Sequence, residues 1–213
     1  MLNEAHRDYV VRDYEFRGGG RLDELRLHYV TLGVPRTVDG QITNAVLFLH
    51  WTGASSASLL SETFRDALFL PGQALDLERH YVIIPDNVGH GRSSKPSDGL
   101  RTRFPRYGYR DMVDLQHRLV VEELGIHRLR LILGLSMGGM HAWLWGQEFP
   151  EAIEALMPIV CQPAAITGRN LLWRKIVAHA VRTDPGWRGG DYSEQPHGFT
   201  ATFPLVQMML AGV

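Results

Sequence analysis

The sequence predicts an α/β fold, with a mostly parallel sheet and helices on both of its faces. Short continuous apolar runs, which are typical of parallel strands covered on both sides, alternate along the chain with segments of helical periodicity. One of these runs leads through a Gly-x-Ser-x-Gly pentapeptide straight into a helix. This alternation favours parallel strands joined by right-handed crossovers.

A β-hairpin is predicted at the start of the chain. Apolar side chains nearly alternate with polar ones over Arg21 to Leu32, which indicates an exposed antiparallel strand. Its partner is expected around Tyr9 to Phe16, with Gly18-Gly19-Gly20 as the turn. This hairpin would begin the sheet.

Four parallel strands should follow, at 45–49, 81–84, 129–133 and 155–160. A helix is expected before the third of them, because Met112, Leu115, Leu119, Val120 and Leu124 recur at helical spacing. Asp111 and Asp114 suit its N-terminal end, and Gly125 suits its end. The helix after Ser136 should bury Met137, Met140, Leu144 and Trp145, with Gly138 and Gly139 allowing close approach to the sheet.

The pattern changes after Val160. Arg169 to Arg182 and Phe199 to Leu210 are predicted helices, joined by a loop over 184–190 that is rich in glycine. A helical insertion of this kind commonly caps an active site. The expected organisation is a core over residues 1–160 and the start of a helical lid over 161–213.

Composition narrows the function classes. The chain has 213 residues and a formal net charge of −1, so it has no field that would gather nucleic acid or an anionic membrane surface. Its single cysteine excludes an internal disulfide, and charges near the N-terminus argue against a signal peptide. A cytoplasmic protein is expected, with no metal and no cofactor.

The strongest chemical signal is the pentapeptide Gly134 to Gly138, which lies between a strand and a helix. This is the pattern of a nucleophile elbow, whose tight turn strains the central residue while flanking glycines leave room for it. Ser136 is therefore the predicted nucleophile. Two backbone N–H groups should hold the oxyanion that forms on attack, those of Met137 and of Thr52 in the loop after Leu49.

Other reactive side chains are expected to have structural roles. His50 should hydrogen-bond within its own loop, and His90 should support the glycine-rich turn after the strand at 81–84. His141, one turn into the helix after Ser136, is expected to be packed or at the surface. Cys161 is expected to be a small buried filler.

Three stretches together resemble the homoserine O-acetyltransferase-like branch of the α/β-hydrolase superfamily: Gly134 to Pro150, Tyr109 to Val113, and Asp184 to Trp187 with Tyr192. The likeness extends from about Leu25 to Met209. It implies an eight-stranded, mostly parallel sheet, a helical lid after the sixth strand, and a Ser-Asp-His triad with Ser136 as nucleophile.

The chain departs from that branch in three places. Trp51 stands in the oxyanion loop where a small residue is usual, and Gly89 to Pro96 resembles the corresponding stretch of general hydrolases. The triad acid and histidine would follow a seventh and an eighth strand, and neither strand is recognisable after Gly190. Asp184 or Asp191 with His197 has the right order, but these positions match the lid. A fold that ends after the sixth strand and part of the lid is expected, with 155–160 as an apolar sheet edge open to aggregation or dimerisation.

These observations lead to one main hypothesis and two alternatives. The main hypothesis is a serine hydrolase that acts on a small acyl substrate through an acyl-Ser136 intermediate, in a chain that is incomplete as written. One alternative is acyl transfer of the homoserine O-acetyltransferase type, with acyl-coenzyme A as donor. The other is a binding protein that keeps the fold without catalysis.

Overall fold

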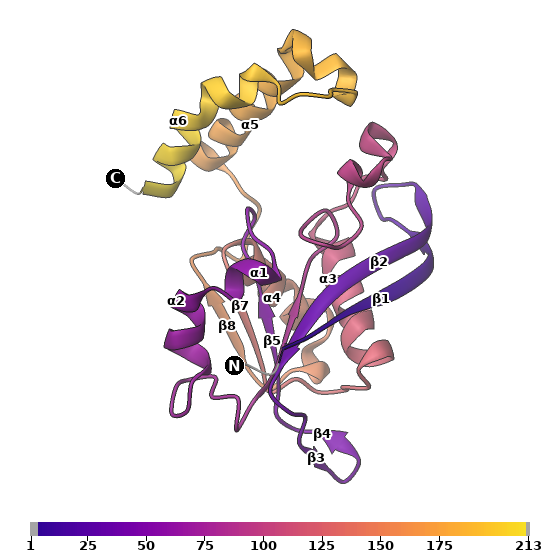
Figure 1. Cartoon of the computed structure of the whole chain (residues 1–213), viewed down its shortest axis with the longest axis vertical. Coiled ribbons are helices and arrows are strands. Elements are labelled where there is room, and N and C mark those ends of the chain that lie inside the picture. Colours follow the sequence, from indigo (N-terminus) through magenta and orange to yellow (C-terminus); the bar gives the residue numbers. More distant parts are fainter. Residues whose placement is uncertain (1–3, 212–213) are drawn as a thin grey trace. The chain divides into compact units, whose positions relative to one another are not determined.

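The computed structural model describes residues 4–211. The chain forms two compact units, Met1–Lys95 with Pro105–Pro163, and Pro96–Phe104 with Ala164–Val213. A six-stranded sheet lies in the first unit, and the second is helical (Figure 1). No helix in the described part of the chain is both long and apolar enough to cross a membrane.

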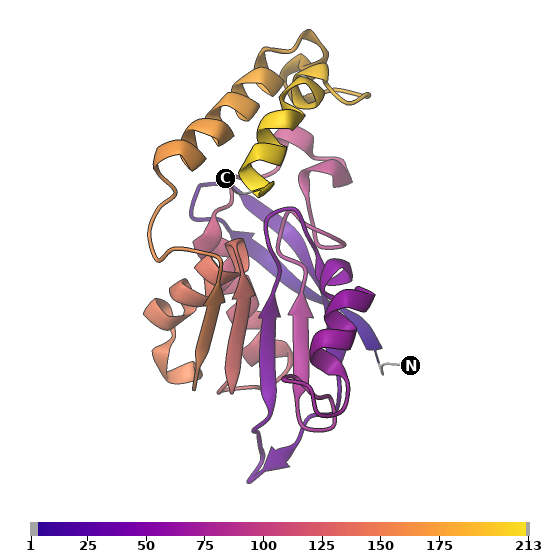
Figure 2. The same cartoon turned by 90° about the vertical axis from the view of Figure 1, so that its left-hand side faces the viewer.

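The sheet confirms the predicted fold class. Its strand order is β1-β2-β6-β5-β7-β8. The hairpin β1-β2 is antiparallel and β6 is antiparallel to β2, whereas β6, β5, β7 and β8 run parallel to one another, and Figure 2 shows these four side by side. The strands are β1 (Glu4–Glu15), β2 (Arg21–Leu32), β5 (Ala45–Leu49), β6 (Tyr81–Pro85), β7 (Leu131–Leu135) and β8 (Leu156–Ile159).

The predicted hairpin is present, and its glycine turn is closed by a hydrogen bond from the Phe16 N–H to the Gly20 carbonyl at 3.0 Å. The expectation of an exposed strand over Arg21 to Leu32 is wrong for its second half. Residues 27–32 are buried, because β6 pairs with this half of β2 on the side opposite β1. The strand is therefore internal where it was expected to be open.

The four parallel strands lie where the apolar runs predict them, with shifts of one or two residues at the ends. The largest shift is in β7, because Leu129 forms only an isolated bridge with Ile153 before the regular ladder begins. Val160 lies just beyond β8 with a positive φ of 52°. A separate two-stranded hairpin is formed by β3 (Thr37–Val38) and β4 (Gln41–Ile42).

One face of the sheet is covered by α1 (Ser56–Leu59), α2 (Glu62–Phe64) and a π-helical continuation over Arg65–Phe69. The main core cluster forms here, where Phe48 of β5 packs near Phe69, with ring centroids 6.4 Å apart. Figure 1 shows α2 and α3 on opposite sides of the sheet.

The other face carries α3 (Tyr109–Arg118), which continues as a π-helical segment over Leu119–Glu123 and ends before Gly125 at φ 63°. Beside it lies α4 (Met137–Glu148). The expected buried face of α4 needs correction, since Met140 and Leu144 are only partly buried whereas His141 and Trp145 are completely buried. The helix packs against both the sheet and α3, so its second buried side is the one facing α3.

The second unit contains the two helices expected after Val160, α5 (Gly168–Thr183) and α6 (His197–Ala211), which pack against each other. The connection between them is a 3-10 segment over Pro185–Gly190. Shorter 3-10 turns occur at Pro96–Asp98 and Arg101–Arg103 in this unit and at Pro150–Ala152 in the first.

Candidate active site

Ser136 lies in the sharp turn between β7 and α4. Its backbone has φ 53° and ψ −109°, a conformation that a residue with a side chain adopts only under strain. The Ser136 N–H donates to the Ile159 carbonyl at 2.9 Å, which ties the turn to the end of β8. The predicted strand, turn and helix are therefore all present around this hydroxyl.

Two glycines make the turn sterically feasible. A Cβ on Gly134 would lie 2.1 Å from the Gly138 carbonyl oxygen, and a Cβ on Gly138 would lie 2.3 Å from the Leu49 carbonyl oxygen. Both obstacles are backbone atoms, so a side chain at either position would have to push the strand or the helix aside. The spacing read from the sequence reflects this close approach.

The predicted oxyanion loop leaves the sheet beside the turn. Leu49, the last residue of β5, pairs with Gly134 of β7 in the parallel ladder, so Thr52 and Ser136 follow neighbouring strand ends at the same edge. Met137 is the first residue of α4, and the first N–H groups of a helix have no partner within it. Thr52 is exposed, and no hydrogen bond among residues 4–211 uses its N–H.

The carbonyl groups of this loop are held from two sides. The Trp51 carbonyl accepts from His50 Nδ1 at 2.8 Å and from the Ala54 N–H at 3.1 Å. The Thr52 carbonyl lies 3.0 Å from His90 Nε2. The structure thus confirms that His50 bonds within its own loop, and it gives His90 a second role, as a contact between the turn after β6 and this loop.

The nearby histidines are engaged in the fold. Burial lowers the pKa of His50 to about 4, and burial, with smaller contributions from His50 and His90, lowers that of His141 to about 3. His50 Nε2 accepts from the Asn87 N–H at 3.2 Å. Within residues 4–211, no hydrogen bond joins the Ser136 hydroxyl to any of these rings.

Asp184 and Asp191 precede His197 in the order expected of a triad, but both make structural contacts within the second unit. Asp184 accepts from the Gly186 N–H at 2.7 Å and from the Gly198 N–H at 2.5 Å, and these bonds lower its pKa. Asp191 pairs with Arg101. Asp184 is therefore the cap of the 3-10 segment and a tie to the start of α6.

Cys161 is partly exposed, which corrects the expectation of a buried filler. Its position is nevertheless a packing position, because a Cβ on Gly139 would lie 2.6 Å from its sulfur. Burial raises the pKa of the thiol. The side chain supports the approach of α4 to the end of β8, and its raised pKa disfavours the reactive thiolate.

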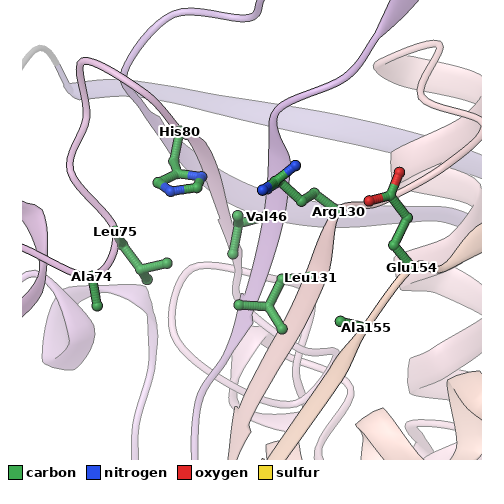
Figure 3. A pocket seen from close by; sticks show the side chains of 8 residues that line it. All are labelled: Val46, Ala74, Leu75, His80, Arg130, Leu131, Glu154 and Ala155. Carbon is green, nitrogen blue, oxygen red and sulfur yellow. The ribbon is translucent and has the colours of Figure 1, made fainter.

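A cavity of about 390 Å³ lies at the N-terminal ends of the parallel strands, opposite the end where Ser136 lies. Figure 3 shows His80, Arg130 and Glu154 around it, beside Val46 and Leu131. These residues stand at or before the starts of β5, β6, β7 and β8, whereas Ser136 follows the end of β7. The cavity is therefore separate from the predicted nucleophile. In the described part of the chain, no group of His, Cys, Asp and Glu side chains could hold a metal ion.

Sequence reasoning missed a set of buried polar side chains behind the oxyanion loop. Asn87, Gln116 and Trp145 are at most 1% exposed and are joined by hydrogen bonds. Gln116 offered a signal, because it lies one turn after Met112 and one turn before Leu119, in the middle of an apolar helix face. Asn87 offered none, since it lies in a loop.

Comparison with known proteins agrees with this geometry. A family model described as the alpha/beta hydrolase fold matches residues 44–212. A homoserine O-acetyltransferase of Thermobifida fusca is 36% identical over 192 residues, covering 84% of this chain and 49% of that protein. A probable acyltransferase of Methanothermobacter thermautotrophicus is 33% identical, covering 92% of this chain and 60% of that protein.

Solved structures show the same relationship. A homoserine O-acetyltransferase from Bacillus anthracis aligns with a TM-score of 0.83 and 26% identity, covering 98% of this chain and 61% of that one. An acetylester hydrolase from Corynebacterium glutamicum aligns with a TM-score of 0.83 and 25% identity, covering 96% and 58%. The chain spans about half to three fifths of the length of the curated relatives it matches. It belongs to the α/β-hydrolase fold family, in the homoserine O-acetyltransferase-like branch.

Proposed function

We propose that Ser136 is the nucleophile of an acyl hydrolase or acyltransferase that works through an acyl-serine intermediate. The observation that carries this proposal is the strained backbone of Ser136, with φ 53° at the junction of β7 and α4. Strain of this kind persists where the surrounding structure enforces it, and it is common at catalytic residues. The neighbouring N–H groups of Met137 and Thr52 are the proposed oxyanion donors.

The chemistry would run in two halves. The Ser136 oxygen attacks the acyl carbonyl carbon as a general base takes the hydroxyl proton, and the two N–H groups stabilise the negative oxygen. Collapse of this tetrahedral species breaks the bond to the leaving alcohol or thiol, which receives the proton. Water then releases the acyl group as an acid, or an acceptor hydroxyl carries it away as a new ester.

The proposed mechanism also needs a general base and an acid partner that orients it. The sheet of residues 4–211 has no strand beyond β8 in chain order, whereas the resemblance implies an acid and a histidine after two further strands. The matched relatives are longer than this chain, and we propose that both groups follow two further strands, as the resemblance implies. The complete reading frame tests this placement, and two further strands without a following acid and histidine would contradict it.

Labelling tests the nucleophile. A fluorophosphonate probe should modify the protein encoded by the complete reading frame at one site, and peptide mass spectrometry should place the adduct on Ser136. Ser136→Ala should abolish labelling, while Ser97→Ala, which removes an exposed hydroxyl from the second unit, should leave it unchanged. An adduct on another serine, or none at all, would refute the proposal.

Acyl transfer to homoserine is the second candidate, because the relatives include proteins named homoserine O-acetyltransferase. Others among the structural neighbours are named as an acetylester hydrolase and an acetyl esterase. Comparing acetyl transfer from acetyl-coenzyme A to homoserine with hydrolysis of a p-nitrophenyl ester would separate them. Ligand binding that persists in Ser136→Ala, with no turnover in the parent protein, would instead indicate a non-catalytic binding protein.

The remaining proposals concern the whole protein. We propose that the chain consists of a core over residues 1–160, followed in sequence by the start of a helical lid over residues 161–213. The lone cysteine, Cys161, supports a cytoplasmic location, since that compartment keeps thiols reduced. The apolar edge strand β8 supports a homodimer.

A further inference from the structure

A chain of buried hydrogen bonds runs from α4 through α3 to the oxyanion loop. Trp145 Nε1 donates to Gln116 Oε1 at 2.8 Å, and Gln116 Nε2 donates to Asn87 Oδ1 at 2.5 Å. Asn87 Nδ2 lies 3.0 Å from His50 Nε2, and His50 Nδ1 lies 2.8 Å from the Trp51 carbonyl. We call these four side chains and this carbonyl the relay.

The direction of every bond in the relay follows from its first member. An indole N–H can only donate, so Gln116 presents its oxygen to Trp145 and its amide nitrogen to Asn87. Asn87 then presents its own nitrogen to His50 Nε2, which must accept. The proton of His50 is therefore on Nδ1, where it is donated to Trp51. The Asn87 backbone N–H also donates to Nε2 at 3.2 Å and enforces the same tautomer.

The hydrogen bonds to the Trp51 carbonyl determine the direction in which the Thr52 N–H points. The peptide between Trp51 and Thr52 is planar, and in a trans peptide the carbonyl and the N–H point in opposite directions. Its carbonyl is held on the inner side by His50 and by the Ala54 N–H. The Thr52 N–H must therefore point away from His50, on the exposed side of the loop.

We propose that the relay positions the Thr52 N–H as an oxyanion donor, with His50, Asn87 and Gln116 as positioning residues. This inference rests on the proposed function of Ser136, since it assigns a purpose to one of the two donors beside that serine. The side chains of the relay are at most 1% exposed. A hydrogen bond lost within the relay would therefore leave a buried polar group that water does not reach. The relay joins four segments that are remote in sequence, namely α4, α3, the loop after β5 and the loop after β6.

A matched pair of variants at His50 separates positioning from folding. The amide of His50→Asn can place a donor near the position of Nδ1, whereas His50→Gln reaches the position of Nε2 and leaves the Trp51 carbonyl without this donor. In the protein encoded by the complete reading frame, we expect His50→Gln to lower the maximal rate of fluorophosphonate labelling at Ser136 by about 10-fold or more, with little change in probe affinity. His50→Asn should recover most of that rate.

Asn44→Leu supplies the stability control. Asn44 is another buried amide that hydrogen-bonds backbone groups, but it lies before β5, at the far edge of the sheet. Asn44→Leu removes these hydrogen bonds, so it should lower the urea unfolding midpoint without slowing the labelling of Ser136. Equal labelling rates for His50→Asn and His50→Gln, or an equal slowing by Asn44→Leu, would overturn the relay.

The tautomer of His50 can be measured in the unaltered protein, so this test does not depend on whether a variant folds. Nitrogen-15 shifts of the histidine rings report which nitrogen carries the proton, and His50 should have it on Nδ1, with Nε2 bare. The opposite tautomer would overturn the proposal. Absence of labelling at Ser136 in the unaltered protein would instead refute the proposed function, so the two failures are distinguishable.

Discussion

Gly138 sets how closely α4 approaches the end of β5. A Cβ at this position would lie 2.3 Å from the Leu49 carbonyl oxygen, so Gly138→Ala must move either the helix or the strand. We expect it to destabilise the protein by about 1–3 kcal/mol and to slow labelling of Ser136, as measured by urea unfolding and probe kinetics.

Gly146→Ala is the matched control on the same helix. The added Cβ would meet only the flexible end of the Leu156 side chain, at 2.7 Å, and alanine favours a helix interior over glycine by about 1 kcal/mol. The stability change should therefore be small. A loss as large as that of Gly138→Ala would show that backbone contact at β5 is not the decisive factor.

Buried histidines make stability depend on pH. Burial lowers the folded-state pKa of His50 to about 4 and that of His141 to about 3, from an ordinary value of 6.5. Between the folded-state pKa values and 6.5, the unfolded chain binds more protons than the folded protein. The contribution of these histidines to the free energy of unfolding is therefore fully present above pH 6.5 and is lost as the pH drops toward 4. His80 and His117 contribute in the same direction.

Urea unfolding at pH 7.5, 6.5, 5.5 and 4.5 would measure this loss, which should reach a few kcal/mol, because one pKa unit corresponds to about 1.4 kcal/mol. His141→Leu removes one of the titrating groups and should flatten the curve. A variant curve with the same slope as the parent would exclude His141 as a contributor.

At the scale of elements, Asp111 joins the start of α3 to the hairpin. Its carboxylate accepts from the Gly108 N–H and from the Arg17 N–H, both at 2.8 Å, and it is 2% exposed. Asp111→Ala leaves two donors without an acceptor, which costs about 1–3 kcal/mol for each that stays buried. The unfolding midpoint should fall clearly.

Asp114 is the comparison within the same helix. It forms an i,i+4 pair with Arg118 at 3.1 Å, and both side chains are partly exposed. Such pairs contribute about 0.3–0.5 kcal/mol, so Asp114→Ala should have a small effect. Equal losses from the two variants would mean that Asp111 does not act as a tie between elements.

At the scale of the whole protein, the two edge strands of the sheet, β1 and β8, differ in how well they are protected against pairing with another chain. The edge strand β1 carries many charges, whereas β8 exposes Met157 at 51% and has no strand on its outer side within residues 4–211. Edges without charge favour association between chains. Met157→Lys should reduce self-association of the 213-residue chain in light scattering over a concentration series.

Val10→Lys on β1 controls for added charge, because Val10 is similarly exposed at 41% but lies on the charged edge. It should change association much less than Met157→Lys. Equal effects of the two variants would indicate a general effect of net charge, and no effect of either would exclude edge pairing through β8.

Local sequence determined the elements and the elbow. The pentapeptide around Ser136, the glycine turn of the hairpin and the helical spacing before Gly125 each involve residues close together in the chain, so their conformation depends on local sterics and periodicity. The apolar runs also located the parallel strands, because burial on both faces requires continuous apolar residues.

Tertiary structure decided what surrounds the nucleophile. Only the strand order places the end of β5 beside that of β7, and only packing between α3 and α4 brings Gln116 to Trp145 and Asn87. These contacts join residues 29 positions apart in sequence. No local pattern encodes such pairing, because hydrogen bonds between distant segments depend on how the folded elements meet.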